Sequence, residues 1–141
     1  MHFMTIQEAK KLLALHSGRD DEIDNPKWKN GFLGSLRPFS GTLQKENFIE
    51  VMDCLNTLKD ELAAPAVDRE IIADIVSITH QTRTWTSPEG MLGSNHLLTK
   101  EQTEQLLLWA DIIEECLMWL LDEDEEEAFS AYHEYLEGEL I

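Results

Sequence analysis

The segment that decides the fold is TKEQTEQLLLWADIIEECLMWLLD, residues 99–122. Its first residues, Thr99 and Gln102, form a capping box, in which two side chains satisfy free backbone N–H groups at the start of a helix. Apolar residues then recur at helical spacing and cover roughly 200° of the helix circumference. These residues are Leu106, Trp109, Ala110, Ile112, Ile113, Cys116, Leu117, Trp119, Leu120 and Leu121. A helix this apolar needs neighbours on more than one side, so we expect either the central helix of a bundle or self-association through one flank.

The same reasoning predicts four further helices. Segments 42–63 and 69–85 each carry one apolar stripe at helical spacing, and Asp68 is a favourable N-cap for the second. Shorter helices are expected over 7–16 and after the acidic run 122–127, the last one ending at Gly138. We therefore predict an all-α, single-domain, antiparallel bundle over residues 1–141. It should have about five helices, three long and two short, with helix 99–122 (the fourth) at its centre.

Length and composition indicate a globular protein without a membrane segment. The chain has 141 residues, of which 43% are hydrophobic, so it can form one domain with a sizeable core. Its two cysteines, Cys54 and Cys116, lie in apolar stretches and are expected to be reduced, buried thiols. The N-terminus lacks the long apolar core of a signal peptide, and the longest apolar runs are too short to span a bilayer. We therefore expect a cytoplasmic protein with no membrane partner.

The charge is strongly negative and unevenly distributed. The net charge is −17, from 28 acidic and 11 basic residues. Residues 1–85 contribute −3 and residues 86–141 contribute −14, with Lys100 as the only basic residue of the second part. This sign excludes nucleic acid as a partner of the C-terminal part and favours a basic protein partner, or mimicry of nucleic acid. The alternative is that acidity serves solubility alone.

Sequence motifs for catalysis and metal binding are absent. There is no HExxH, no CxxC, no ExxH of a di-iron bundle, no G-x-S-x-G and no P-loop. The five histidines are scattered along the chain. We predict no catalytic residue, no metal ligand and no cofactor, which favours a non-enzymatic protein over an enzyme.

A loop rich in glycine, GFLGSLRPFSGT at 31–42, interrupts the helical pattern. Only residues 64–67 join helices 42–63 and 69–85, so these helices should pack antiparallel. The loop, the end of the second helix and the start of helix 99–122 should then meet at one end of the bundle. Arginines and helix N-termini at that end could bind an anion or a carboxylate, and glycines would permit close approach. The candidate ligand-binding residues are Arg37, Phe39, Arg83, Trp85 and Asn95, with Trp28 and Met91 as further apolar walls.

These features support more than one function. The first hypothesis is a non-enzymatic acidic interaction protein of the adaptor, inhibitor or immunity type, which binds another protein. The alternative is a module that binds a small ligand or anion around Arg37, Arg83 and Trp85, and that could be an enzyme. A third is a homo-oligomer. Folding alone offers a competing interpretation of the loop: its apolar residues would close the core, and Arg37 would pair with an acidic residue such as Glu89.

Overall fold

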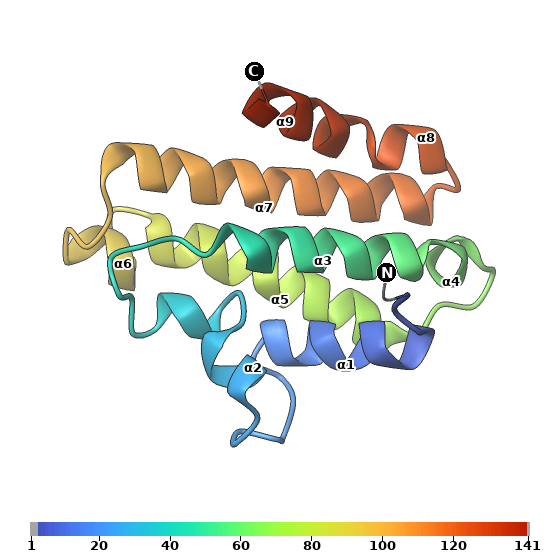
Figure 1. Ribbon diagram of the computed structural model, residues 1–141, viewed down its shortest axis with the longest axis horizontal. Helices are drawn as coiled ribbons and strands as arrows, with labels where there is room; N and C mark the ends of the chain where they lie inside the picture. Colours follow the sequence, from blue (N-terminus) through green and yellow to red (C-terminus); the bar gives the residue numbers. More distant parts are fainter. Residues whose placement is uncertain (1–2, 141) are drawn as a thin grey trace.

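All regular secondary structure in the computed structural model, which describes residues 3–140, is helical. The elements are α1 Ile6–His16, α2 Pro26–Asn30, the 3-10 helix η1 Gly34–Leu36, α3 Lys45–Thr57, α4 Lys59–Ala63, α5 Arg69–Thr86, α6 Met91–Ser94, α7 Lys100–Leu121, α8 Glu125–Ala128 and α9 Ser130–Leu140 (Figure 1). The capping boxes predicted at Thr5 and Thr99 are both formed, and the Asp68 side chain accepts a hydrogen bond from the Glu70 N–H (2.9 Å). The predicted all-α fold is confirmed.

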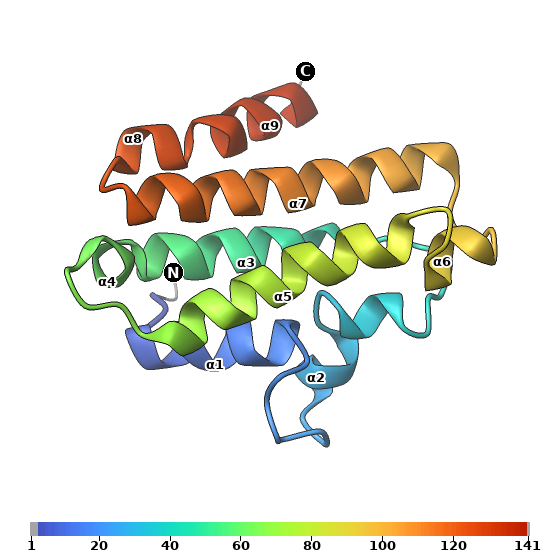
Figure 2. The ribbon, with the colours of Figure 1, turned by 180° about the vertical axis from the view of Figure 1, so that it is seen from behind.

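The long helices are arranged around α7 (Figures 1 and 2). α7 lies between α8 and α9 on one side and α3 and α5 on the other, as expected for the central helix. α1 packs on the far side of α3 and α5. α3, α5 and α7 alternate in direction, so the start of α3, the end of α5 and the start of α7 share one end of the bundle. There the Gln102 side-chain amide donates a hydrogen bond to the Gly41 carbonyl oxygen (2.9 Å).

Aromatic side chains join α3, α7 and α9 in the core. The rings of Phe48 and Trp109 stack with their centroids 5.3 Å apart, and Tyr135 meets Phe48 edge-on, also at 5.3 Å. Trp109 Nε1 donates a hydrogen bond to the Tyr135 hydroxyl (3.1 Å), so the buried indole N–H has a partner. These contacts fix α9 on α7.

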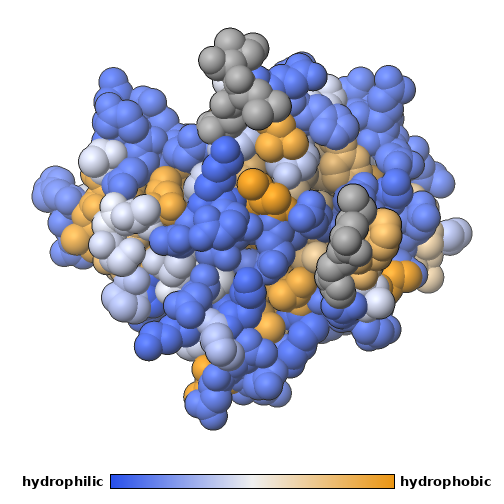
Figure 3. All heavy atoms as spheres, in the orientation of Figure 1, coloured by the Kyte–Doolittle hydropathy of each residue, from blue (hydrophilic) through white to orange (hydrophobic). Residues whose placement is uncertain are grey.

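The acidic run lies at the opposite end of the bundle from the glycine-rich loop. Lys59 of α4 pairs there with Glu125 of α8, with 2.6 Å between Lys59 Nζ and Glu125 Oε1. On the face shown in Figure 3, hydrophilic residues predominate and hydrophobic residues form small separate groups. The structure thus separates the acidic run from the end where the candidate ligand-binding residues were expected.

The helix boundaries differ from the prediction in three places. The helix expected over 42–63 begins at Lys45, so Thr42 is not its cap, and it is interrupted at Leu58, where the backbone (φ −95°, ψ 6°) separates α3 from α4. Gly138 lies within α9 and does not end it. Within residues 3–140 the number of helical elements exceeds five, because the connecting segments form the short helices α2, η1 and α6. Of these short helices, α2 had a signal in the sequence, because Pro26 stands at its first position, directly after the capping Asn25.

Candidate functional site

A groove of about 600 Å³ is lined by residues of α5 and of the segment that connects α1 to α3. We call it the Trp28–Trp85 groove, because both indoles line it, together with the Pro38 ring and three cationic side chains: Arg19, Lys29 and Arg37. Figure 2 shows where α5 and the connecting segment lie in the bundle. Of the acidic residues in the described part of the chain, none lines the groove. An acidic protein therefore carries one concave surface that is locally basic and partly apolar.

The glycines of loop 31–42 allow it to form one wall of this groove. A Cβ atom at Gly34 would lie 2.3 Å from the Trp28 carbonyl oxygen, and one at Gly31 would lie 2.5 Å from the Lys27 carbonyl oxygen. Both distances are far below van der Waals contact, so only glycine fits at these positions. The loop is thereby held directly against α2, which carries Trp28.

The apolar residues of the loop close the core, as the folding interpretation predicted, but Arg37 has no such role. Phe32, Leu33 and Leu36 are each at most 5% exposed. The Arg37 side chain is exposed on the groove and makes no ion pair with any described side chain (residues 3–138), so the pairing considered with Glu89 is not formed.

Arg83 lies on a different side of α5 and is engaged within the protein. Its guanidinium donates hydrogen bonds to Glu114 Oε2 and Asp111 Oδ1 of α7, both at 2.7 Å. The hydrogen bonds to Glu114 and Asp111 raise the pKa of Arg83. This arginine therefore joins α5 to α7 through intramolecular ion pairs.

The other predicted residues are divided between the groove and its surroundings. Trp85 lines the groove with Arg37, as expected. Phe39 is partly buried against the core, and the Asn95 side-chain amide donates to the Met91 carbonyl oxygen (2.7 Å). Neither Phe39 nor Asn95 lines the groove.

A buried histidine holds the groove wall in place, a role that was not predicted from the sequence. His16 is 0% exposed, and its Nδ1 accepts a hydrogen bond from the Phe32 N–H (2.8 Å). Because Nδ1 is an acceptor, the ring proton is on Nε2, which lies 2.8 Å from Glu50 Oε1 and donates to it. The bonds from His16 and from Lys27 (3.0 Å) lower the pKa of Glu50 to about 2. The sequence contained one indication that His16 is buried, because it falls on the apolar face of α1.

A second surface is the exposed side of α7, which we call the α7 face. It consists of Glu101, Glu104, Leu108, Asp111, Glu114, Glu115, Met118 and Leu121. The three apolar members are 44%, 52% and 42% exposed, in chain order. The five acidic members are all exposed as well. The second flank of the central helix is therefore left uncovered, apolar and acidic at once.

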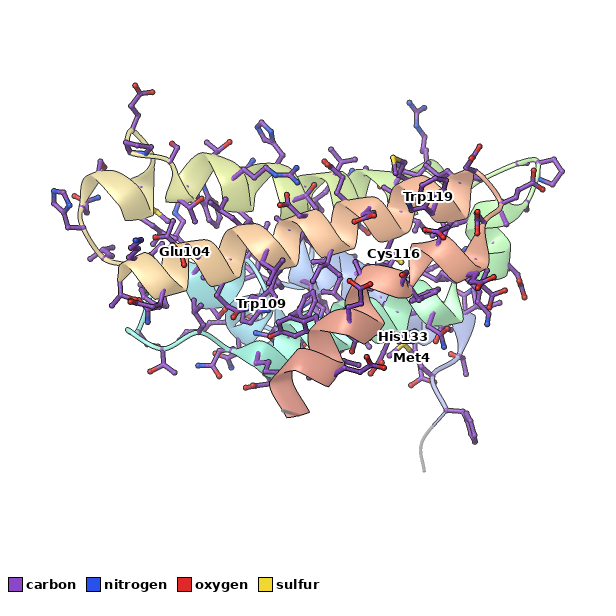
Figure 4. The ribbon with its side chains drawn as sticks, turned by 90° about the horizontal axis from the view of Figure 1, so that it is seen from above. Met4, Glu104, Trp109, Cys116, Trp119 and His133 are labelled. Atoms are coloured by element: carbon purple, nitrogen blue, oxygen red, sulfur yellow. The ribbon has the colours of Figure 1, made fainter. Side chains whose placement is uncertain are left out.

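The α7 face continues onto α5 near the C-terminal end of α7. Val76 of α5 is 49% exposed and precedes Arg83 by two helical turns, while Met118 follows Asp111 by two turns. Since Arg83 pairs with Asp111 across antiparallel helices, Val76 lies level with Met118. Trp119 lies on the α5 side of α7 (Figure 4), next to a hollow of about 440 Å³, and its buried indole N–H has no partner among the described residues.

No described group of residues points to metal or thiol chemistry. Among the described side chains, residues 3–138, no cluster of three or more His, Cys, Asp or Glu is placed to hold a metal ion. Cys54 and Cys116 are free and fully buried, and burial raises the pKa of the Cys116 thiol to about 12. Neither thiol is therefore a reactive thiolate at neutral pH. None of the described helices has the length and apolar content needed to cross a bilayer.

Comparison of the chain with known protein families, with curated proteins and with solved structures found no match.

Proposed function

We propose that this chain is a non-enzymatic interaction protein of the adaptor, inhibitor or immunity type, which binds a basic protein through its α7 face. The observation that carries the proposal is the composition of this face, where three half-exposed apolar side chains stand among five carboxylates. Within the described structure, Arg83 is the basic residue that pairs with two of these carboxylates. The other three carboxylates of the face, Glu101, Glu104 and Glu115, are available to a partner.

The apolar and acidic residues of this face would have different roles in binding. Burying Leu108, Met118 and Leu121 supplies affinity, since removing an apolar side chain from water stabilises a complex by about 1.5–3 kcal/mol when burial is complete. Carboxylates around them select a partner of opposite charge and accelerate its association. A lysine- or arginine-rich amphipathic helix with an apolar stripe has both properties.

Self-association through α7 is the competing use of the same apolar residues. Two copies of this face would bring carboxylates from both chains together, and each chain has a net charge of −17. Like charges at an interface disfavour that complex. The charge of the face therefore favours a basic partner over a second copy of the chain.

The experiment compares two charge-matched double variants. Glu115→Lys/Met118→Lys reverses charge and removes an exposed apolar group on the α7 face. Glu46→Lys/Leu97→Lys makes the same change at exposed positions elsewhere. Proteins captured from a lysate at low salt are purified, and their affinity for each form is measured by calorimetry.

The proposal requires a purified basic partner whose affinity falls with added salt. This affinity should drop at least about tenfold in the α7 variant and be retained in the control. Equal affinity of the two variants would exclude the α7 face as the site. If light scattering shows a dimer that only the α7 variant disrupts, the α7 face binds a second copy of the chain and not a basic partner.

A further inference from the structure

We infer that the Trp28–Trp85 groove is a binding site for a small aromatic anion. Its carboxylate or phosphate would contact Arg37 and Lys29, and its ring would lie against the two indoles. This site is separate from the α7 face, so the inference does not depend on the proposed function.

The cations of the groove differ in whether they have a carboxylate partner within the protein. In a chain with 28 acidic and 11 basic residues, most basic side chains can find a carboxylate, and Arg19 does so. Its guanidinium lies 2.8 Å from Asp74 and 3.0 Å from Glu70. Arg37 and Lys29 line the same groove, but neither forms an ion pair with any residue of the described structure. Two cations thus remain available, one of them a guanidinium that can donate two parallel hydrogen bonds to a carboxylate or phosphate.

Apolar side chains form the other walls of the groove. Trp28 on α2 and Trp85 on α5 come from separate elements, and Pro38 adds a third apolar surface next to Arg37. Large flat side chains provide extensive apolar contact for a planar ring. A volume of about 600 Å³ is within the range of small-molecule sites, where apolar walls surround a few polar groups. A planar ring that carries an anionic group is the class of ligand that fits both the cations and the apolar walls of the groove.

The groove is held in shape before any ligand binds. The wall that carries Arg37 is anchored to α1 by two hydrogen bonds, from the Phe32 N–H to His16 Nδ1 (2.8 Å) and from the Leu33 N–H to the His16 carbonyl oxygen (3.0 Å). Gly34 packs directly on the backbone of α2. A preorganised site loses little entropy on binding, so a small ligand can bind with measurable affinity.

The experiment uses four probes on the full chain, each titrated by calorimetry. 2-Naphthoate is an aromatic carboxylate, and 1-naphthyl phosphate is an aromatic phosphate. 2-Naphthamide keeps the ring without the charge, and inorganic phosphate keeps the charge without the ring. We expect at least one aromatic anion to bind at least about tenfold more tightly than both the amide and inorganic phosphate. Which aromatic anion binds more tightly distinguishes a carboxylate ligand from a phosphate ligand.

Matched variants locate the site. Arg37→Gln and Lys29→Gln remove the groove cations, while Arg69→Gln and Lys100→Gln remove exposed cations elsewhere. We expect Arg37→Gln to weaken binding of the aromatic anion roughly tenfold or more, and the two control variants to leave it unchanged. In NMR spectra the indole N–H signals of Trp28 and Trp85 should shift on binding, and that of Trp119 should not.

Three results would overturn the inference. The first is the absence of binding by both aromatic anions at millimolar concentration. The second is equal affinity for 2-naphthoate and 2-naphthamide, which would show that charge is not recognised. The third is equal loss of affinity in Arg37→Gln and Arg69→Gln, which would indicate general electrostatics. None of these results bears on partner binding at the α7 face, so the two proposals fail separately.

Discussion

Replacement of His16 by alanine should destabilise the protein by about 3 kcal/mol. The imidazole is 0% exposed and is the acceptor for the Phe32 N–H. Without it, a buried backbone N–H is left unpaired, which costs about 1–3 kcal/mol. The loss of a fully buried ring leaves a cavity that costs on the order of another 1–2 kcal/mol. Glu50 keeps Lys27 as a partner, which offsets part of the loss of its bond to His16. Because a domain of this size is stable by about 5–15 kcal/mol, the variant should still fold.

Equilibrium urea unfolding followed by far-UV circular dichroism measures this loss, and two further variants test its cause. His16→Asn places a side-chain oxygen near the position of Nδ1, so it should recover about 1 kcal/mol by again accepting the Phe32 N–H. His80→Ala, at an exposed position of α5, should change the free energy of unfolding by less than about 0.5 kcal/mol. A loss below about 1 kcal/mol in His16→Ala, or no recovery in His16→Asn, would refute the role assigned to this histidine.

Three further predictions concern pH, thiols and close packing. The pKa of Glu50 is lowered to about 2 from 4.5, so its stabilising effect is present above pH 4.5 and is lost as the pH falls toward 2. The free energy of unfolding of the wild type should therefore fall by about 1–2 kcal/mol more than that of Glu50→Gln over this range, as measured by urea unfolding. Cys54 and Cys116 should react with a thiol reagent in the unfolded protein and be protected in the native one, as followed by thiol titration. Gly93→Ala should cost about 2–4 kcal/mol because its Cβ would lie 1.9 Å from the Ser87 carbonyl oxygen; Gly138→Ala, with open space around it, is the thermal-unfolding control.

The helices and their relative directions were predictable from the sequence. The capping boxes at Thr5 and Thr99 and the N-cap at Asp68 act over three residues or fewer, so their effect can be read locally. The short link between α4 and α5 was enough to predict that α3 and α5 are antiparallel, and the modest loop before α7 was enough to predict that α7 starts at the end where α5 stops. The break at Leu58 was not predictable in this way, because the apolar stripe continues through it.

The composition of the groove was only partly predictable, because it depends on which face of α5 each residue occupies. Arg83 and Trp85 are two positions apart, which places them on different sides of one helix. Trp85 lines the groove with Arg37, whereas Arg83 pairs with Glu114 of α7. Arg19 lies far from Arg83 and Trp85 in the sequence, and no motif around it indicated that it would line the groove.

The sign of charge keeps the two proposed sites from competing. α5 contributes to both, with Ser77, Gln81 and Trp85 on the groove and Arg83 beside the α7 face. A basic partner is attracted to the α7 face and repelled by Arg37 and Lys29. A small anion meets the reverse arrangement, because no described carboxylate lines the groove, whereas five are exposed on the α7 face. The uneven charge of this chain is therefore the common basis of both proposals, which assign opposite kinds of ligand to two surfaces of one small bundle. Occupancy of one surface should leave the affinity of the other unchanged, unless α5 itself moves.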